Sequence, residues 1–103
     1  MRICVLGPLT VEIDGAAVTI GGPRVRALLA ALALEPGRLV PADRLIGMLW
    51  GDGPPTNPAN ALQTLVKRLR AALRPSAAVA ARAGGYLLDV DPADVDAYQF
   101  TSL

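Results

Sequence analysis

Residues 58–74 carry the pattern of an amphipathic helix, and a chain of 103 residues must build its core around a helix of that length. Pro58 suits the first turn, where its missing N–H needs no partner, and Thr56 or Asn57 can cap the helix. Pro75 closes it. At about 100° per residue, one face of this helix is wholly apolar. The apolar face consists of Leu62, Leu65, Val66, Leu69 and Leu73.

The N-terminal residues show strand and turn patterns. Three short apolar or alternating runs predict strands over Arg2–Leu6, Leu9–Ile13 and Ala16–Ile20. The dipeptide Asp14-Gly15 fits a two-residue hairpin turn, because glycine tolerates the positive φ that such a turn needs. We therefore expect a small antiparallel sheet here.

Two further helices are expected before residue 58. The first begins at Pro23 and ends before Pro36-Gly37. The second spans about Ala42–Trp50, and the stiff turn over residues 51–55 cannot continue it. The side chains that these two helices are expected to bury are Val25, Leu28, Leu29, Leu32, Leu45, Ile46 and Leu49.

A hairpin pattern follows the long helix. Val79–Arg82 and Tyr86–Val90 predict strands, with a turn over residues 83–85. Three strands, three helices and a terminal hairpin form an α+β winged helix-turn-helix domain, in which the hairpin is the wing. We assign residues 1–92 to this domain and residues 93–103 to a linker or the start of a further helical domain.

Missing residue types exclude most catalytic and metal-binding chemistry. There is no histidine, so a His general base, a Ser-His-Asp triad and His metal sites are impossible. Cys4 is the only cysteine, which excludes an internal disulfide, and we expect it to be a buried strand residue. The longest apolar run, Ala27–Leu34, is far shorter than the roughly 20 residues that span a bilayer. We expect no enzyme activity, cofactor, metal or membrane partner, and a cytoplasmic location.

The net charge of +1 hides an uneven distribution. Residues 53–88 contain five bases and no acid, whereas residues 89–103 contain four aspartates and no base. The face of the long helix opposite its apolar stripe is polar and basic, and such side chains address the base edges and phosphates of duplex DNA. A solvated basic face is the alternative, but surface helices usually mix signs. We predict DNA contacts from Asn60, Gln63, Thr64, Lys67, Arg68, Arg70 and Arg74.

Five residues outside this helix also attract a functional interpretation. Arg82 precedes the hairpin turn, where an arginine can enter the minor groove, and a mobile tip residue is the alternative. Tyr86 is expected to pack the wing onto the long helix. Arg24 and Arg26, in the first turn of the first helix, contact phosphate or are simply solvated. Trp50 is expected to anchor the core, with exposure to a protein partner as the alternative.

The sequence also contains a set of ordered short motifs. They are Leu6-Gly7-Pro8-Leu9, Gly22-Pro23-Arg24, Asp43-Arg44-Leu45-Ile46, Leu49-Trp50-Gly51-Asp52 with Pro54-Pro55, Asn60-Ala61-Leu62-Gln63, Arg68-Leu69-Arg70, Ala72-Leu73 and Gly85-Tyr86-Leu87-Leu88. Over essentially all of residues 1–100, the chain closely resembles the N-terminal domain of the Streptomyces antibiotic regulatory proteins, a winged helix-turn-helix of OmpR type.

The resemblance implies a function. Members of this family activate clustered genes for antibiotics and other secondary metabolites. They bind direct repeats of double-stranded DNA upstream of promoters, as a head-to-tail pair, and help to recruit RNA polymerase holoenzyme. By resemblance, the long helix reads the major groove and the wing contacts the minor groove. The loop after the second helix faces polymerase or DNA, and its residues include Trp50, Gly51, Asp52, Thr56 and Asn57.

Two positions depart from the family pattern. Pro41 stands where the family often has a Ser or Thr that caps the second helix, so the first N–H groups of this helix need another partner. Ala81 replaces a Thr often seen before the wing arginine, which removes a hydroxyl contact to phosphate. The competing hypothesis is a winged helix that binds only proteins, its basic helix docking on an acidic partner. No exposed apolar anchors are visible on the basic face to support that alternative.

Overall fold

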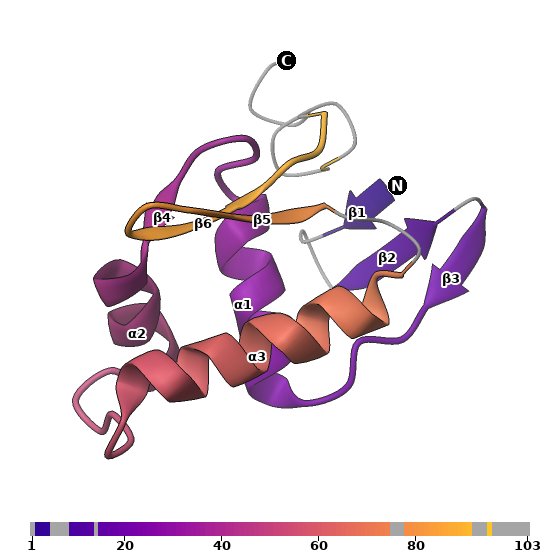
Figure 1. The fold of residues 1–103 in the computed structure, drawn as a ribbon. Helices are drawn as coiled ribbons and strands as arrows, with labels where there is room; N and C mark the ends of the chain where they lie inside the picture. The colour runs from indigo at the N-terminus through magenta and orange to yellow at the C-terminus, as the bar shows by residue number, and fades with distance from the viewer. Residues whose placement is uncertain (1, 5–8, 14, 75–77, 92–94, 96–103) are drawn as a thin grey trace.

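The computed structural model describes residues 2–4, 9–13, 15–74, 78–91 and 95. Within these residues the chain forms a three-stranded sheet, three helices and a second three-stranded sheet (Figure 1). This order of elements is that of the predicted α+β winged helix-turn-helix domain.

The N-terminal sheet consists of β1 (Arg2–Cys4), β2 (Thr10–Ile13) and β3 (Ala16–Val18), antiparallel and in that order. Alternation along β2 places Val11 and Ile13 in the core and leaves Glu12 exposed. Gly15, at the hairpin turn, has φ of +81°, which a residue with a side chain rarely adopts. Ile3 also forms an isolated parallel β-bridge with Val95, and both side chains are fully buried.

The three helices are α1 (Pro23–Ala33), α2 (Ala42–Trp50) and α3 (Pro58–Ala72). α1 and α3 begin with proline at the first helical position, as the sequence predicts. α3 packs on α1 and α2 through its apolar face. The buried residues of this face are Leu62, Leu65, Val66 and Leu69, with Leu73 at the C-cap.

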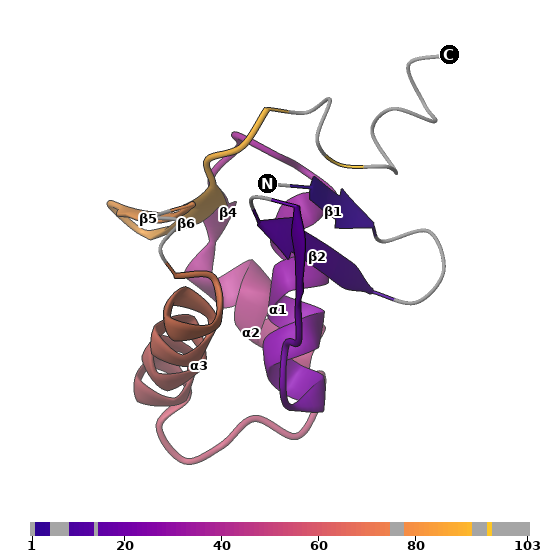
Figure 2. The same cartoon turned by 90° about the vertical axis from the view of Figure 1, so that its right-hand side faces the viewer.

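The second sheet has the order β4-β6-β5, with β4 at Val40–Pro41, β5 at Val79–Arg82 and β6 at Gly85–Leu88. The β5–β6 hairpin is the wing, and it lies on the same side of the molecule as α3 (Figure 2). The sequence prediction missed β4. A two-residue strand ending in proline has no periodicity of its own, and it forms only because Val40 and Pro41 pair with Tyr86 and Gly85.

Some predicted boundaries and burials were wrong. β3 ends at Val18 rather than Ile20, and β6 covers Gly85–Leu88 rather than 86–90, because pairing with the neighbouring strand sets where a strand ends. Ile46 and Leu49 are only partly buried, since α2 is short and turns only Leu45 fully into the core. Cys4 is half-buried rather than buried, since it pairs with exposed Thr10 at the end of β1.

Parts of four other predictions lie outside the described residues. They concern the end of the first strand over residues 5–6, Asp14 of the hairpin turn, Pro75 after the long helix and most of the segment 93–103.

Candidate nucleic-acid interface

The start of α3 is fixed by a side-chain cap. Asn57 has non-helical backbone angles, and its Oδ1 accepts a hydrogen bond of 3.2 Å from the backbone N–H of Asn60. Of the two predicted caps, Asn57 rather than Thr56 therefore occupies the N-cap position. One turn later, the Thr64 hydroxyl donates to the Asn60 carbonyl oxygen over 3.0 Å. The Thr64 oxygen consequently remains free to accept a hydrogen bond, with its own proton already used.

A hollow of about 330 Å³ separates α3 from the wing, and we call it the wing groove. Most of its wall comes from the exposed face of α3, and the rest from the hairpin. Five residues of the predicted DNA-contact set meet here with a buried valine and two wing residues. The residues lining it are Asn60, Gln63, Thr64, Lys67, Arg70, Val66, Ala81 and Tyr86.

The charge of the wing groove is wholly positive. Lys67 and Arg70 line it from α3. Arg82, which does not line it, is exposed beside the hairpin turn, at the strand position opposite Gly85. Among the described residues, Arg44 and Glu35 form an ion pair with a nitrogen–oxygen distance of 3.1 Å, and neither residue lines the groove. No carboxylate is among the described residues that line the groove, so its two cations favour an anionic ligand.

Arg70, which lines the groove, and Arg82, near the wing tip, also make internal contacts. Arg70 Nε donates a hydrogen bond of 3.2 Å to the carbonyl oxygen of Val79, the first residue of β5. Arg82 Nη1 donates to the adjacent Ala81 carbonyl over 2.9 Å. Tyr86 is partly buried and packs against the core beside α3, as the sequence predicts.

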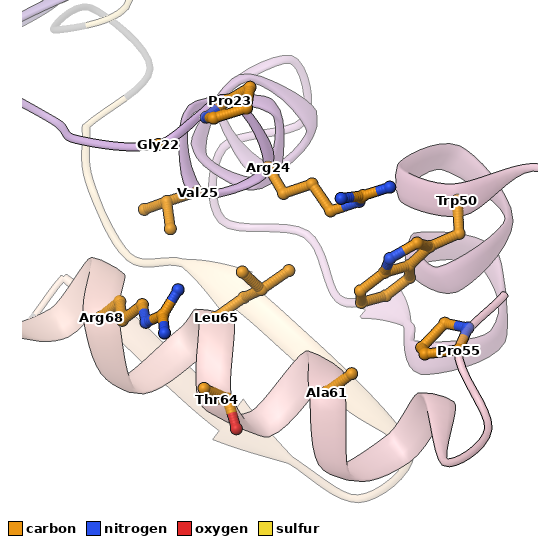
Figure 3. A pocket seen from close by; sticks show the side chains of 10 residues that line it. All are labelled: Gly22, Pro23, Arg24, Val25, Trp50, Pro55, Ala61, Thr64, Leu65 and Arg68. Atoms are coloured by element: carbon orange, nitrogen blue, oxygen red, sulfur yellow. The ribbon is translucent and has the colours of Figure 1, made fainter.

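Arg68 and Arg24 lie in a different hollow. A pocket of about 370 Å³ between the start of α1, the end of α2 and α3 contains both arginines, and we call it the Trp50 pocket (Figure 3). The Arg24 guanidinium carbon lies 5.6 Å from the centroid of the Trp50 ring, within range of a cation–π contact. Arg68 extends from α3 toward Val25 (Figure 3). The structure thus divides the residues that the sequence grouped by charge.

The remaining predicted residues are dispersed. Arg26 lines a third hollow of about 250 Å³ against β2 and β3, away from Arg24. Arg74 is exposed just after α3 ends. Trp50 is partly buried against the core, so it anchors the end of α2 while leaving part of its ring accessible. The rest of the predicted partner loop, Gly51, Asp52, Thr56 and Asn57, is exposed.

Sequence reasoning missed two glycines of the wing that hold it in place. The backbone N–H of Ala42, the first residue of α2, donates to the Gly84 carbonyl oxygen over 2.9 Å. This bond satisfies the first N–H of a helix whose N-cap residue, Pro41, makes no side-chain cap. At Gly85, a Cβ would overlap the Val40 carbonyl oxygen and lie 3.0 Å from Pro41 Cα. The Gly84-Gly85 pair predicts a turn, but the sequence does not show that the backbone at Gly85 packs closely against β4.

Other kinds of site find little support in this part of the chain. None of the described helices combines the length and the apolar character needed to cross a membrane. Over the same residues, no group of three or more Cys, Asp or Glu side chains converges on a point where a metal ion could bind.

The chain was compared with known proteins. Residues 17–88 match the family described as "Transcriptional regulatory protein, C terminal". The chain is 44% identical over 86 residues to the regulatory protein AfsR of Streptomyces coelicolor, covering 84% of this chain and 9% of AfsR. It is 34% identical over 113 residues to the regulatory protein DnrI of Streptomyces peucetius, covering all of this chain and 42% of DnrI. The chain therefore spans less than half the length of these relatives.

A solved structure gives the same result for the fold. Mycobacterium tuberculosis EmbR, in complex with a low affinity phosphopeptide, superposes with a TM-score of 0.86 at 34% sequence identity. The match covers 98% of this chain and 28% of the EmbR chain. At that identity and coverage, the shared fold reflects a shared family. The chain belongs to the Streptomyces antibiotic regulatory proteins, a family of transcriptional regulators rather than enzymes, and corresponds to their OmpR-type winged helix-turn-helix domain.

Proposed function

We propose that this chain is the sequence-specific DNA-binding domain of a cytoplasmic transcriptional activator of a secondary-metabolite gene cluster. The observation that carries the proposal is the wing groove, where amide, hydroxyl and cationic side chains meet on one exposed helix face. α3 enters the major groove, which is about 12 Å wide, and Asn60 and Gln63 address base edges there. Lys67 and Arg74 neutralise phosphates, and Arg82 enters the adjacent minor groove from the wing tip.

The family relationship supports the rest of the proposal. The domain comprises residues 1–92, and residues 93–103 lead into a further domain, in keeping with the greater length of AfsR and DnrI. Two copies bind direct repeats head to tail, so the repeats are spaced by about one helical turn. The exposed loop Gly51–Asn57 and the accessible part of Trp50 form the surface offered to RNA polymerase.

The experiment is a selection of the 103-residue chain against a random duplex library at moderate salt. The expected result is one short motif, recovered as a direct repeat. Measured on the selected duplex, log affinity should fall linearly with log salt with a slope of about −0.9 for each phosphate contact. Lys67→Gln should reduce the magnitude of that slope by about one contact, whereas a base-reading variant should leave it unchanged.

The alternative is a protein-docking winged helix without specific DNA binding. The observation in its favour is the Trp50 pocket, where an accessible aromatic ring lies beside Arg24 and Arg68 lines the other side (Figure 3). If the library yields no motif and only bulk binding that salt abolishes, this alternative replaces the proposal. Recovery of a motif, followed by its loss in a chain carrying both Asn60→Ala and Gln63→Ala, excludes it.

A further inference from the structure

Besides the strand pairing, three hydrogen bonds among the described residues join the wing to the rest of the domain. At its base, Arg70 Nε on α3 donates to the carbonyl oxygen of Val79 over 3.2 Å. At its tip, the Gly84 carbonyl oxygen accepts from the N–H of Ala42 over 2.9 Å. A third bond, from the N–H of Gly37 to the carbonyl oxygen of Leu88 over 2.8 Å, lies at the base of β6, and β6 also pairs with the two-residue strand β4. Val79 and Leu88 are also buried in the core at this base, and of the three bonds only the one from Arg70 is made by a side chain.

Arg70 differs from the other bases of α3 in this respect. Lys67 lines the same groove, but the hydrogen bond seen from α3 to a carbonyl of the described wing residues comes from Arg70, and Arg68 lies in the Trp50 pocket. The Nε–H of an arginine is a single donor of fixed direction on a planar group. Once it is bonded to Val79, the guanidinium plane is fixed relative to β5, and with it the path of the strand that leads to Arg82.

We propose that Arg70 is a positioning residue, which sets where the wing arginine Arg82 lies relative to α3. The inference rests on the proposed function, because it concerns how one domain reaches two grooves at once. α3 and Arg82 can both engage DNA only if the wing stands at a fixed offset from the helix. Arg70 fixes this offset through its hydrogen bond to Val79. The sequence alone predicts that Arg70 contacts DNA.

The direct test is made on the free protein. In an NMR spectrum of the 103-residue chain, the Arg70 Nε–H should show a scalar coupling across the hydrogen bond to the carbonyl carbon of Val79. In Arg70→Lys, resonance shifts should concentrate in residues 79–85 and leave α1 unchanged. An Arg70 Nε–H that exchanges with water as fast as that of exposed Arg24, with no coupling, overturns the proposal whatever the DNA experiments give.

The functional test is a double-mutant cycle on the selected duplex. Arg70→Lys keeps the charge and removes the Nε donor, so affinity should fall about five- to tenfold with an unchanged salt slope. In an Arg82→Ala background the same substitution should cost less than twofold, because the side chain that it positions is gone. Lys67→Gln is the matched control, and it should lower the affinity by the same factor in wild type and in the Arg82→Ala background.

The remaining outcomes are also decisive. If Arg70→Lys loses the same affinity with and without Arg82, Arg70 acts on DNA directly and the proposal fails. Thermal unfolding followed by circular dichroism shows whether each variant is folded at the assay temperature. If wild type finds no motif in the library, the proposed function fails, yet the coupling between Arg70 and Val79 still decides whether the arginine positions the wing.

Discussion

Replacing Gly85 with alanine places a methyl group where the backbone of β4 already lies. The added Cβ would overlap the Val40 carbonyl oxygen and lie 3.0 Å from Pro41 Cα, closer than nearly all real Cβ contacts. Both obstacles are backbone atoms, so no rotamer change relieves them. Either β4 or the wing must move, and the movement disrupts the pairing of Val40 with Tyr86 and the bond from Ala42 to Gly84.

The size of the effect follows from those contacts. The ladder between β4 and β6 and the cap of α2 are each worth about 1 kcal/mol per hydrogen bond lost. Losing two or three of them should lower the free energy of unfolding by about 2–3 kcal/mol. For a domain of this size about 1 kcal/mol shifts Tm by roughly 4–8 °C, so Gly85→Ala should melt at least about 8 °C lower.

Gly47→Ala provides a matched control with the opposite sign. Gly47 lies in the middle of α2, is exposed, and a Cβ there meets nothing within 4 Å. Alanine should therefore raise stability by about 0.5–1 kcal/mol through helix propensity. Both variants are measured by calorimetry and urea unfolding. If Gly85→Ala melts within about 2 °C of wild type, or if both variants move in the same direction, the argument from close approach is refuted.

Three further substitutions test other parts of the argument. Leu69→Ala removes a side chain with 0% exposure from the core face of α3 and should cost about 2–5 kcal/mol, measured as a fall in the urea midpoint. Asn57→Ala removes the cap on the Asn60 N–H and should cost about 1 kcal/mol; an unchanged midpoint would show that the cap contributes nothing. Gln63→Ala should reduce the preference for the selected duplex over a scrambled one by about 1–3 kcal/mol in a binding titration, with no change in salt slope if Gln63 reads a base.

The helices were largely predictable because their signals are local. A proline at the first position and an apolar stripe at helical spacing define α1 and α3 without help from the rest of the chain. α2 begins and ends where the composition predicts, between Pro41 and the turn that starts at Gly51. The two-residue strand β4 was not predictable, since it owes its existence to β6, more than forty positions away in sequence.

The candidate site was only half predictable, for a geometric reason. Two residues apart on a helix means about 200° of rotation, so Arg68 and Arg70 point to opposite sides of the exposed arc of α3. The sequence contains that rotation but not the identity of the neighbour on each side. The fold places the Trp50 pocket beside Arg68 and the wing beside Arg70. Charge counting merges these two environments, which is why it assigned both arginines to one ligand.

Pro41 shows how a departure from a family pattern can locate a contact that no motif describes. Without a Ser or Thr at this position, the first N–H groups of α2 must find an acceptor elsewhere, because an unpaired donor at a helix end is costly. For the first of them, the N–H of Ala42, the acceptor is the Gly84 carbonyl of the wing turn, and the absence of a side chain at Gly85 allows this close approach. The N-terminus of α2 and the tip of the wing are thus one structural unit. A change that displaces the tip removes the bond from the first N–H of α2 to Gly84, so substitutions near Gly85 should destabilise α2 as well as the wall of the groove.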